Sequence, residues 1–159
     1  MHVRWFICMT VDEKFMLEAL KEAKKAALLD EVPVGAVLVI DGKIVSRGYN
    51  KREKSYDPTD HAEIIAIRKA CKKFASWRLK EATIYVTIEP CSMCAGAIVW
   101  SRISRVVYGA KDPKGGAIES SLQLFENKNL NHHPEVTGGV LEEECSKLIK
   151  DFFSAKRAK

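Results

Sequence analysis

His61-Ala62-Glu63 and Pro90-Cys91-Ser92-Met93-Cys94 are the stretches that decide the fold of this chain. Together they offer one imidazole, two thiols and one carboxylate. Zinc binds imidazole nitrogen and thiolate sulfur, and a catalytic zinc keeps three protein ligands with a fourth position open for water. His61, Cys91 and Cys94 can supply those three ligands, which leaves the carboxylate free to carry protons. The sequence therefore predicts a catalytic zinc site, with one zinc per chain.

Both stretches are predicted to begin helices. Residues 61–71 carry apolar side chains at helical spacing, and Asp60 before them is a favourable N-cap residue. Pro90 suits the first turn of the second helix. Cys91 and Cys94, three residues apart, then lie on one helix face, so both sulfurs can reach the same ion. The positive helix N-terminus also favours the thiolate form that binds metal.

Other interpretations of the Cys-x-x-Cys pair explain less. A redox pair would account neither for the His61-x-Glu63 arrangement nor for the proline before the first cysteine. Cys8, Cys71 and Cys145 form no second Cys-x-x-Cys pair, so a structural four-cysteine site is not expected. Cys71 lies on the apolar stripe of its helix and is expected to pack in the core.

Length and composition favour one small domain. The chain has 159 residues, of which 47% are hydrophobic, enough for a single core. Five cysteines, an odd number, indicate a reducing compartment, and we expect a cytoplasmic protein. Neither a signal peptide nor a membrane-spanning run is evident. Residues 1–11 are expected to be an N-terminal appendage that need not be ordered, and residues 12–157 a single zinc-dependent domain.

The remaining pattern predicts alternating helices and strands. Thr10-Val11-Asp12-Glu13 resembles a capping box, and Asp41-Gly42 between two apolar runs is a strong hairpin signal. The fold class that follows is α/β: a three-layer α/β/α sandwich with a mixed, about five-stranded central sheet. The predicted helices are 12–30, 61–71, 91–100, a short one at 122–126 and 141–153; the predicted strands are 34–40, 43–49, 82–88, 105–109 and 135–137, with a loop at 50–59.

A family resemblance extends beyond these motifs. His-x-Glu followed by Pro-Cys-x-x-Cys is the signature of zinc nucleobase deaminases, and further segments resemble the bacterial tRNA-specific adenosine deaminases from about residue 12 to 157. The resemblance implies a cytidine-deaminase-like fold, a homodimer, and conversion of the wobble adenosine of a tRNA anticodon stem-loop to inosine. The segments are Glu31-Val32-Pro33-Val34-Gly35-Ala36-Val37, Asp57-Pro58-Thr59, Tyr85-Val86-Thr87-Ile88-Glu89-Pro90-Cys91, residues 101–109, Lys111-Asp112-Pro113-Lys114-Gly115-Gly116, Leu130-Asn131-His132 and Asp151-Phe152-Phe153.

The resemblance also assigns residues to the target nucleotide. Asn50 would hold the target nucleoside, although an asparagine after a strand can simply cap a turn. Phe152 would pack near the flipped nucleotide, and a place in the core is equally compatible with it. Asp60 departs from the family, which has a small residue there, and adds a carboxylate close to the expected metal.

Four further residues are assigned to the flanking RNA. Asp112 and Lys114 match loop contacts to neighbouring nucleotides, and Asn131 and His132 match a second anticodon-facing loop. The alternative for His132 is an ordinary surface position. His133-Pro134 replaces a family arginine and an apolar residue, which removes one permanent positive charge from that loop.

The implied reaction follows from the charges. A zinc ion lowers the pKa of a bound water from ~16 toward ~7. Glu63 would take that proton as the hydroxide attacks C6 of adenine, then protonate N1 and the leaving ammonia. A base inside a stacked helix cannot be reached, so an unpaired loop is the expected substrate.

Two other classes of function compete with this interpretation. A small-molecule deaminase acting on guanine or a free nucleoside would use the same zinc site without any dependence on RNA. A noncatalytic zinc-stabilised binding module would have no use for an open coordination position beside Glu63. No organic cofactor is expected in any of the three cases.

Overall fold

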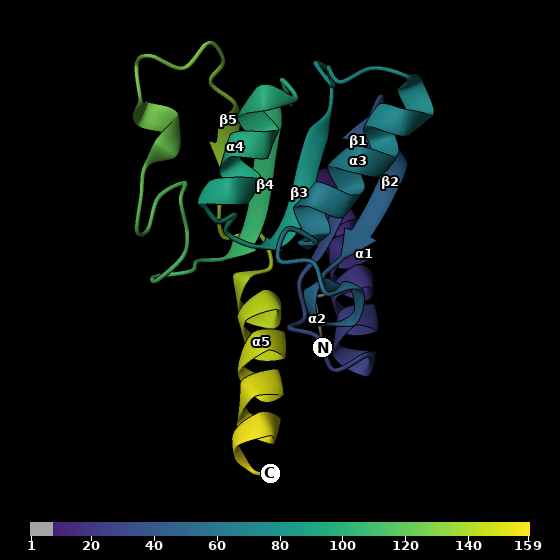
Figure 1. Ribbon diagram of the computed structural model, residues 1–159, viewed down its shortest axis with the longest axis vertical. Coiled ribbons are helices and arrows are strands. Elements are labelled where there is room, and N and C mark those ends of the chain that lie inside the picture. The colour runs from purple at the N-terminus through teal and green to yellow at the C-terminus, as the bar shows by residue number, and fades with distance from the viewer. Residues whose placement is uncertain (1–7) are drawn as a thin grey trace.

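The computed structural model describes residues 8–159 (Figure 1). Five strands form one sheet, and helices cover both of its faces. In chain order the elements are α1 (Val11–Leu28), β1 (Gly35–Ile40), β2 (Lys43–Tyr49), α2 (Arg52–Ser55), α3 (Ala62–Phe74), β3 (Thr83–Ile88), α4 (Ser92–Trp100), β4 (Arg105–Ala110), the 3-10 turn η2 (Leu124–Glu126), β5 (Glu135–Thr137) and α5 (Glu142–Arg157).

The sheet is mixed, with strand order β2-β1-β3-β4-β5. The β1–β2 and β1–β3 pairs are antiparallel, whereas β3–β4 and β4–β5 are parallel. The hairpin predicted at Asp41-Gly42 is confirmed. Both residues have positive φ, 51° and 72°, as the two central residues of a type I′ hairpin turn require.

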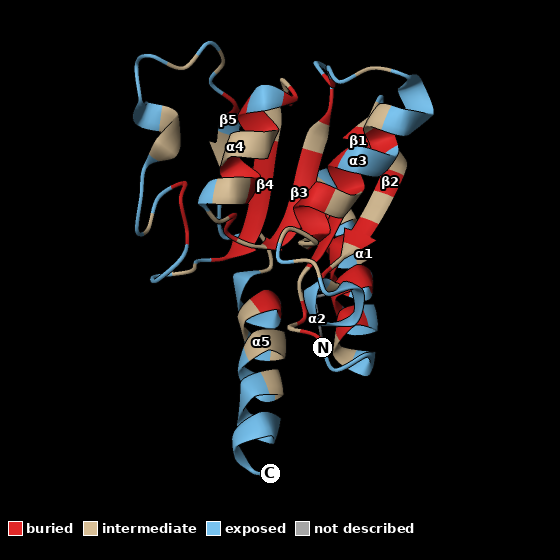
Figure 2. Ribbon diagram, in the orientation of Figure 1, coloured by how far each residue is buried: buried red, intermediate tan, exposed pale blue. Residues whose placement is uncertain are grey.

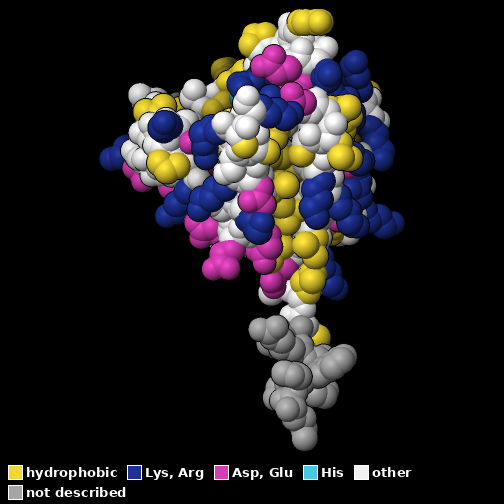
Figure 3. Space-filling model, turned by 90° about the horizontal axis from the view of Figure 1, so that it is seen from below, with side chains coloured by type: hydrophobic (Ala, Val, Ile, Leu, Met, Phe, Trp, Pro, Cys, Tyr) yellow, Lys and Arg dark blue, Asp and Glu magenta, His cyan; other side chains and the backbone are white. Residues whose placement is uncertain are grey.

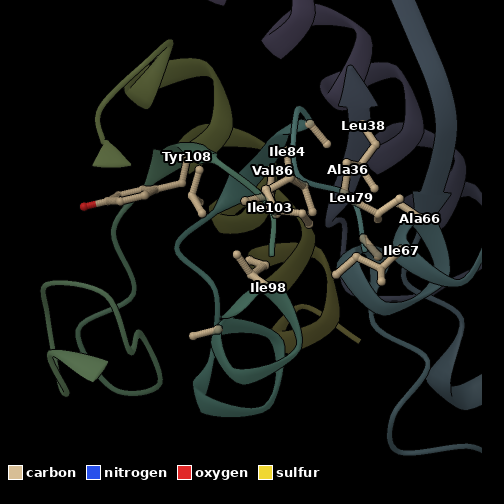
Figure 4. Close-up of a cluster of buried hydrophobic side chains, with 14 of the residues drawn as sticks. Ala36, Leu38, Ala66, Ile67, Leu79, Ile84, Val86, Ile98, Ile103 and Tyr108 are labelled. Atoms are coloured by element: carbon tan, nitrogen blue, oxygen red, sulfur yellow. The ribbon is translucent and has the colours of Figure 1, made fainter. Parts of the chain in front are cut away.

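Alternating side chains of the strands build a core on each face of the sheet. Ala36 and Leu38 of β1 join α3 and α4 in one cluster, which also contains Tyr108 (Figure 4). Val37 of β1 points the other way and packs with α1 and with Cys145 of α5. This period of two between the faces confirms the predicted three-layer α/β/α sandwich.

Several boundaries differ from the predicted ones. The capping box at Thr10 is confirmed, and α1 begins at Val11, so Thr10 and Val11, which were assigned to the appendage, belong to the first helix and its cap. Residues 1–7 lie outside the described part of the chain. The predicted loop 50–59 contains the short helix α2. The N-cap of α3 is His61, not Asp60, and α5 continues to Arg157.

The parallel pairing of β3 and β4 determines where the Pro-Cys-x-x-Cys motif is placed. Because the two strands run in the same direction, their C-terminal ends lie at one edge of the sheet, followed by Cys91 and Asp112. The distal half of α5 extends beyond the body of the domain and is largely exposed (Figures 1 and 2). Within residues 8–159, no helix combines the length and apolar character that crossing a membrane requires.

Two glycines let helix backbones approach the β1–β2 hairpin. A Cβ on Gly35 would lie 2.1 Å from the carbonyl oxygen of Ala19 in α1, and one on Gly48 would lie 2.4 Å from that of Ala62 in α3. Both contacts are far shorter than packing allows, so an added methyl must displace the helix.

We therefore expect Gly35→Ala and Gly48→Ala each to lower the free energy of unfolding by about 1–3 kcal/mol, the usual cost of overpacking. Only Gly48→Ala should also weaken metal binding, because α3 begins directly after His61. Thermal melting combined with metal titration of both variants would test this. Equal metal affinity in the two variants would contradict the proposed link between Gly48 and the metal ligand.

Candidate metal centre and substrate pocket

Three potential ligands meet at one point of the structure. The donor atoms of His61, Cys91 and Cys94 all lie within 4.8 Å of one another. His61 Nδ1 is 3.7 Å from Cys91 Sγ and 3.6 Å from Cys94 Sγ. Tetrahedral zinc, with Zn–N near 2.05 Å and Zn–S near 2.3 Å, would separate nitrogen from sulfur by about 3.6 Å. The donor set therefore fits zinc in both chemistry and spacing.

Two helix N-termini present these ligands. His61 and Cys91 are the N-cap residues of α3 and α4, both with extended backbones, and Cys94 lies in the first turn of α4. Neither N-cap side chain bonds its own helix, so the imidazole and the thiol are available to a metal. The carboxylate of Asp60 pairs instead with Arg68, at 3.0 Å, and does not cap α3.

The thiols are poised for metal binding. The hydrogen bond from Cys94, assisted by His61, holds the pKa of the Cys91 thiol down to about 4. The same bond, together with burial, raises the pKa of Cys94 well above its usual range. Cys91 is therefore readily available as a thiolate, whereas Cys94 would have to release its proton when a metal ion binds.

Glu63 lies beside the ligands on the second residue of α3 and is only 2% exposed. Burial is the main cause that raises the pKa of its carboxyl group. A raised pKa favours the protonated form of the carboxyl group, so it can donate as well as accept a proton, which suits an acid–base role. The structure therefore brings the three ligands and this carboxylate together, as the spacing predicted.

A pocket of about 360 Å³ opens over this cluster. Its volume lies within the range of roughly 300–1,000 Å³ typical of small-ligand sites. The walls combine apolar side chains with a few polar ones, an arrangement that excludes water and orients a ligand. The apolar ones are Val32, Val34, Ile88, Ile149 and Phe153, and the polar ones at the rim include Asn50, Arg52 and Asp112.

Asn50 both lines the pocket and organises the chain. It is 5% exposed. Its side-chain amide donates to the Val32 carbonyl at 3.2 Å, and its oxygen accepts from the Arg52 N–H at 3.2 Å. The turn-capping role is therefore confirmed, and the contact with the target nucleoside stays a prediction that its place in the pocket wall allows.

The aromatic pair on α5 reaches two neighbouring hollows. Phe153 lines both the pocket and an adjacent groove, whereas Phe152 lines only the groove, together with Tyr56 and Lys156. Ile149 and Phe153 are four residues apart and share a helix face, so helical spacing could have identified Phe153. The sequence analysis did not predict Arg52 as a pocket residue, because the segment after Asn50 has no periodic pattern and was interpreted as a loop.

The sequence analysis also did not single out two buried carboxylates, Glu89 in the pocket wall and Glu31 behind it. Glu31 is fully buried and accepts the backbone N–H groups of Glu53 and Lys54 in α2, at 3.0 and 2.7 Å. Glu89 is 1% exposed and holds the loop that carries Asp112. Charged residues beside apolar strands gave no local sign of such contacts.

The remaining predicted RNA contacts lie farther from the metal ligands. Lys114 is exposed on the loop after β4 and does not line the pocket. Asn131 and His132 precede β5, whose first residue pairs with Arg105 at the start of β4. His132 Nε2 lies 2.6 Å from the Ile103 carbonyl oxygen, just before that strand. This loop is therefore at the opposite end of the sheet from the pocket of the same chain.

Comparison with known proteins agrees with the geometry. Residues 9–110 match the family described as the cytidine and deoxycytidylate deaminase zinc-binding region. The chain is 52% identical, over 151 residues, to the tRNA-specific adenosine deaminase of Bacillus subtilis, covering 95% of this chain and 94% of the relative. This chain belongs to the tRNA-specific adenosine deaminases of that family. A relative from Haemophilus influenzae is also 52% identical, over 92% of this chain and 85% of its own.

Solved structures show the same fold. A structure from work on A-to-I editing by tRNA:A34 deaminases aligns with a TM-score of 0.83 and 48% identity, over 85% of this chain and 98% of that one. A guanine deaminase from Nitrosomonas europaea aligns with a TM-score of 0.73 at 21% identity, over 89% of this chain and 84% of that one. The second likeness shows the fold alone.

The metal assignment predicts opposite outcomes for two cysteines. Cys91→Ser should remove most of the bound zinc, because serine does not supply a thiolate. Cys71→Ser should leave zinc content unchanged, since Cys71 packs against the core and burial raises the pKa of its thiol. Elemental analysis of the purified variants measures both. Loss of zinc from the Cys71 variant at unchanged thermal stability would show that the assigned ligand set is incorrect.

Proposed function

We propose that this protein hydrolyses the wobble adenosine of a tRNA anticodon to inosine, releasing ammonia. The observation that carries the proposal is the buried Glu63 beside the three-donor cluster, within a pocket of about 360 Å³. The relatives that match nearly the whole chain are named tRNA-specific adenosine deaminases. One zinc per chain, held by His61, Cys91 and Cys94, completes the proposed site.

The reaction needs a water activated beside the base and a group that moves its protons. A zinc ion at the three donors would lower the pKa of a water ligand toward ~7. Glu63 takes one proton from the attacking water and delivers it to N1 of adenine as the water oxygen bonds to C6. It then passes the second proton to the departing amino group. Asn50 orients the nucleoside, and the apolar walls exclude bulk water.

The substrate is proposed to be an unpaired RNA loop. The pocket has room for an extruded nucleotide but not for a stacked helix, so the target base must leave its stack. The net charge of +5 favours a polyanion. At the end from which α5 projects, a band of hydrophobic side chains has Lys and Arg on both sides, with Asp and Glu also beside its lower part (Figure 3). Basic and apolar side chains in combination suit single-stranded nucleic acid.

A homodimer would complete the site. Helix α4 carries no charged residue, yet Met93, Gly96 and Ala97 are partly exposed and Trp100 is 70% exposed. A helix that is apolar on every side belongs in an interface. Asn131 lies at the far end of the sheet from its own pocket, so its proposed contact with the anticodon requires a second copy of the chain.

The test of the chemistry is Glu63→Gln, assayed for inosine in an anticodon stem-loop. Activity should fall by at least ~10²–10⁴-fold, the usual contribution of acid–base catalysis, while zinc content is unchanged. Glu143→Gln makes the same substitution at an exposed position of α5 and serves as the control, with parental activity expected. A Glu63→Gln protein within tenfold of the parent would refute the assigned role.

The substrate is tested with the parent enzyme. Ammonia release from the stem-loop should far exceed that from free adenosine, guanine or cytidine, because binding energy from the flanking RNA contributes to the reaction. Faster release from guanine would favour the small-molecule deaminase instead.

The dimer predicts complementation between two impaired variants. A mixed dimer of Glu63→Gln and Asn131→Ala chains contains one site with both residues intact, if Asn131 acts across the interface. Random exchange should restore roughly a quarter of the parental sites in a two-fold dimer. Glu63→Gln mixed with Asp112→Ala is the matched control and should restore none, since both residues line the same pocket. Equal recovery in the two mixtures would contradict the arrangement.

A further inference from the structure

Glu89 joins the metal-ligand segment to the loop that carries Asp112. It is 1% exposed, and none of the ion pairs found within residues 8–159 involves it. Five hydrogen bonds satisfy its carboxylate instead. The donors are the backbone N–H groups of Asp112 at 3.3 Å, Ile118 at 3.1 Å, Glu119 at 2.8 Å and Ser120 at 2.9 Å, and the Ser120 hydroxyl at 2.5 Å.

This arrangement makes the position of the loop depend on a single charge. A buried carboxylate is costly unless it is fully hydrogen-bonded, and bonds to a charged acceptor are stronger than neutral ones. Loop residues at both ends of the segment 112–120 therefore converge on one side chain. Gly116 lets the loop close: a Cβ there would lie 2.4 Å from the Glu89 carboxyl carbon.

The same contacts locate Asp112 at the rim of the pocket. Its N–H is held by Glu89, and its own carboxylate accepts the N–H groups of Lys114 and Gly115, each at 3.1 Å. The loop is also tied to the ligand segment by the N–H of Ala117, which donates to the Pro90 carbonyl at 2.8 Å. A continuous set of hydrogen bonds thus runs from beside Cys91 to the residue proposed to contact the flanking RNA.

We propose that Glu89 is a positioning residue, whose carboxylate sets the place of Asp112 and its loop against the nucleotides flanking the target. It acts through the loop and does not touch the reacting atoms. The proposal rests on the RNA substrate proposed above. It predicts that loss of the carboxylate weakens RNA binding while the chemistry at the metal persists.

The experiment is a double-mutant cycle with an anticodon stem-loop as substrate. Glu89→Gln keeps the size of the side chain but turns an amide group toward N–H donors. It should raise KM roughly tenfold or more, as expected for lost bonds to a charge, with kcat per bound zinc within about threefold. Adding Asp112→Ala to Glu89→Gln should cause little further change in KM, because both substitutions remove the same contact.

Glu31→Gln supplies the matched control. It alters an equally buried carboxylate, which supports α2 and shares no hydrogen-bond partner with Asp112. In the Glu31→Gln, Asp112→Ala double variant, the change in KM should equal the product of the changes in the two single variants. Glu89→Asp, which keeps the charge with a shorter reach, should recover part of the binding lost in Glu89→Gln.

Backbone hydrogen exchange gives a readout that needs no substrate. Exchange at residues 118–120 should accelerate in Glu89→Gln but remain parental in Glu31→Gln. Multiplicative effects of Glu89→Gln and Asp112→Ala, or unchanged KM with a lower melting temperature alone, would overturn the positioning role while the RNA substrate stands. A parent enzyme inactive on the stem-loop would overturn both proposals.

Discussion

The candidate metal centre depends on two helix N-termini that lie side by side. His61 begins α3 and Cys91 begins α4, and their donor atoms, with Cys94, lie at separations that suit tetrahedral zinc. Such a cluster of an imidazole and two sulfurs is most stable around a cation, which joins two helices that come from distant parts of the chain. The pocket, the buried Glu63 and the loops at the rim are all arranged around this junction.

The walls of the pocket consist mainly of irregular chain, which lacks the regular hydrogen bonding of helices and strands. Buried carboxylates supply the missing acceptors. Glu31 organises the wall that contains Asn50, and Glu89 organises the wall that contains Asp112. Each carboxylate collects backbone N–H groups, so the cost of burying its charge is offset within the wall itself. The rim can thereby be rigid without being part of the central sheet.

The proposed RNA contacts are distributed over both ends of the sheet. Asp112 follows the C-terminal end of β4, beside the metal ligands, whereas Asn131 lies near the start of that strand. A single chain therefore presents only part of the proposed binding surface to one anticodon. The apolar and partly exposed α4, ending in Trp100, is the face on which a second copy would pack. Catalytic and RNA-binding functions would then combine across the interface.

The sequence by itself determined what depends on local pattern: the candidate metal ligands with Glu63 beside them, the hairpin turn, the capping box and the alternating layers of the sheet. These follow from spacing and periodicity over a few residues. Only the tertiary structure showed that Phe153 rather than Phe152 faces the pocket, that Asp60 pairs with Arg68, and that Glu89 holds a loop more than twenty residues away. For Phe153 and Glu89, the surroundings of the side chain come from segments that are remote in sequence, and a local pattern does not indicate which segments pack together. For Asp60 the partner is only eight residues away, but the choice between capping the helix and pairing with Arg68 depends on where the helix begins.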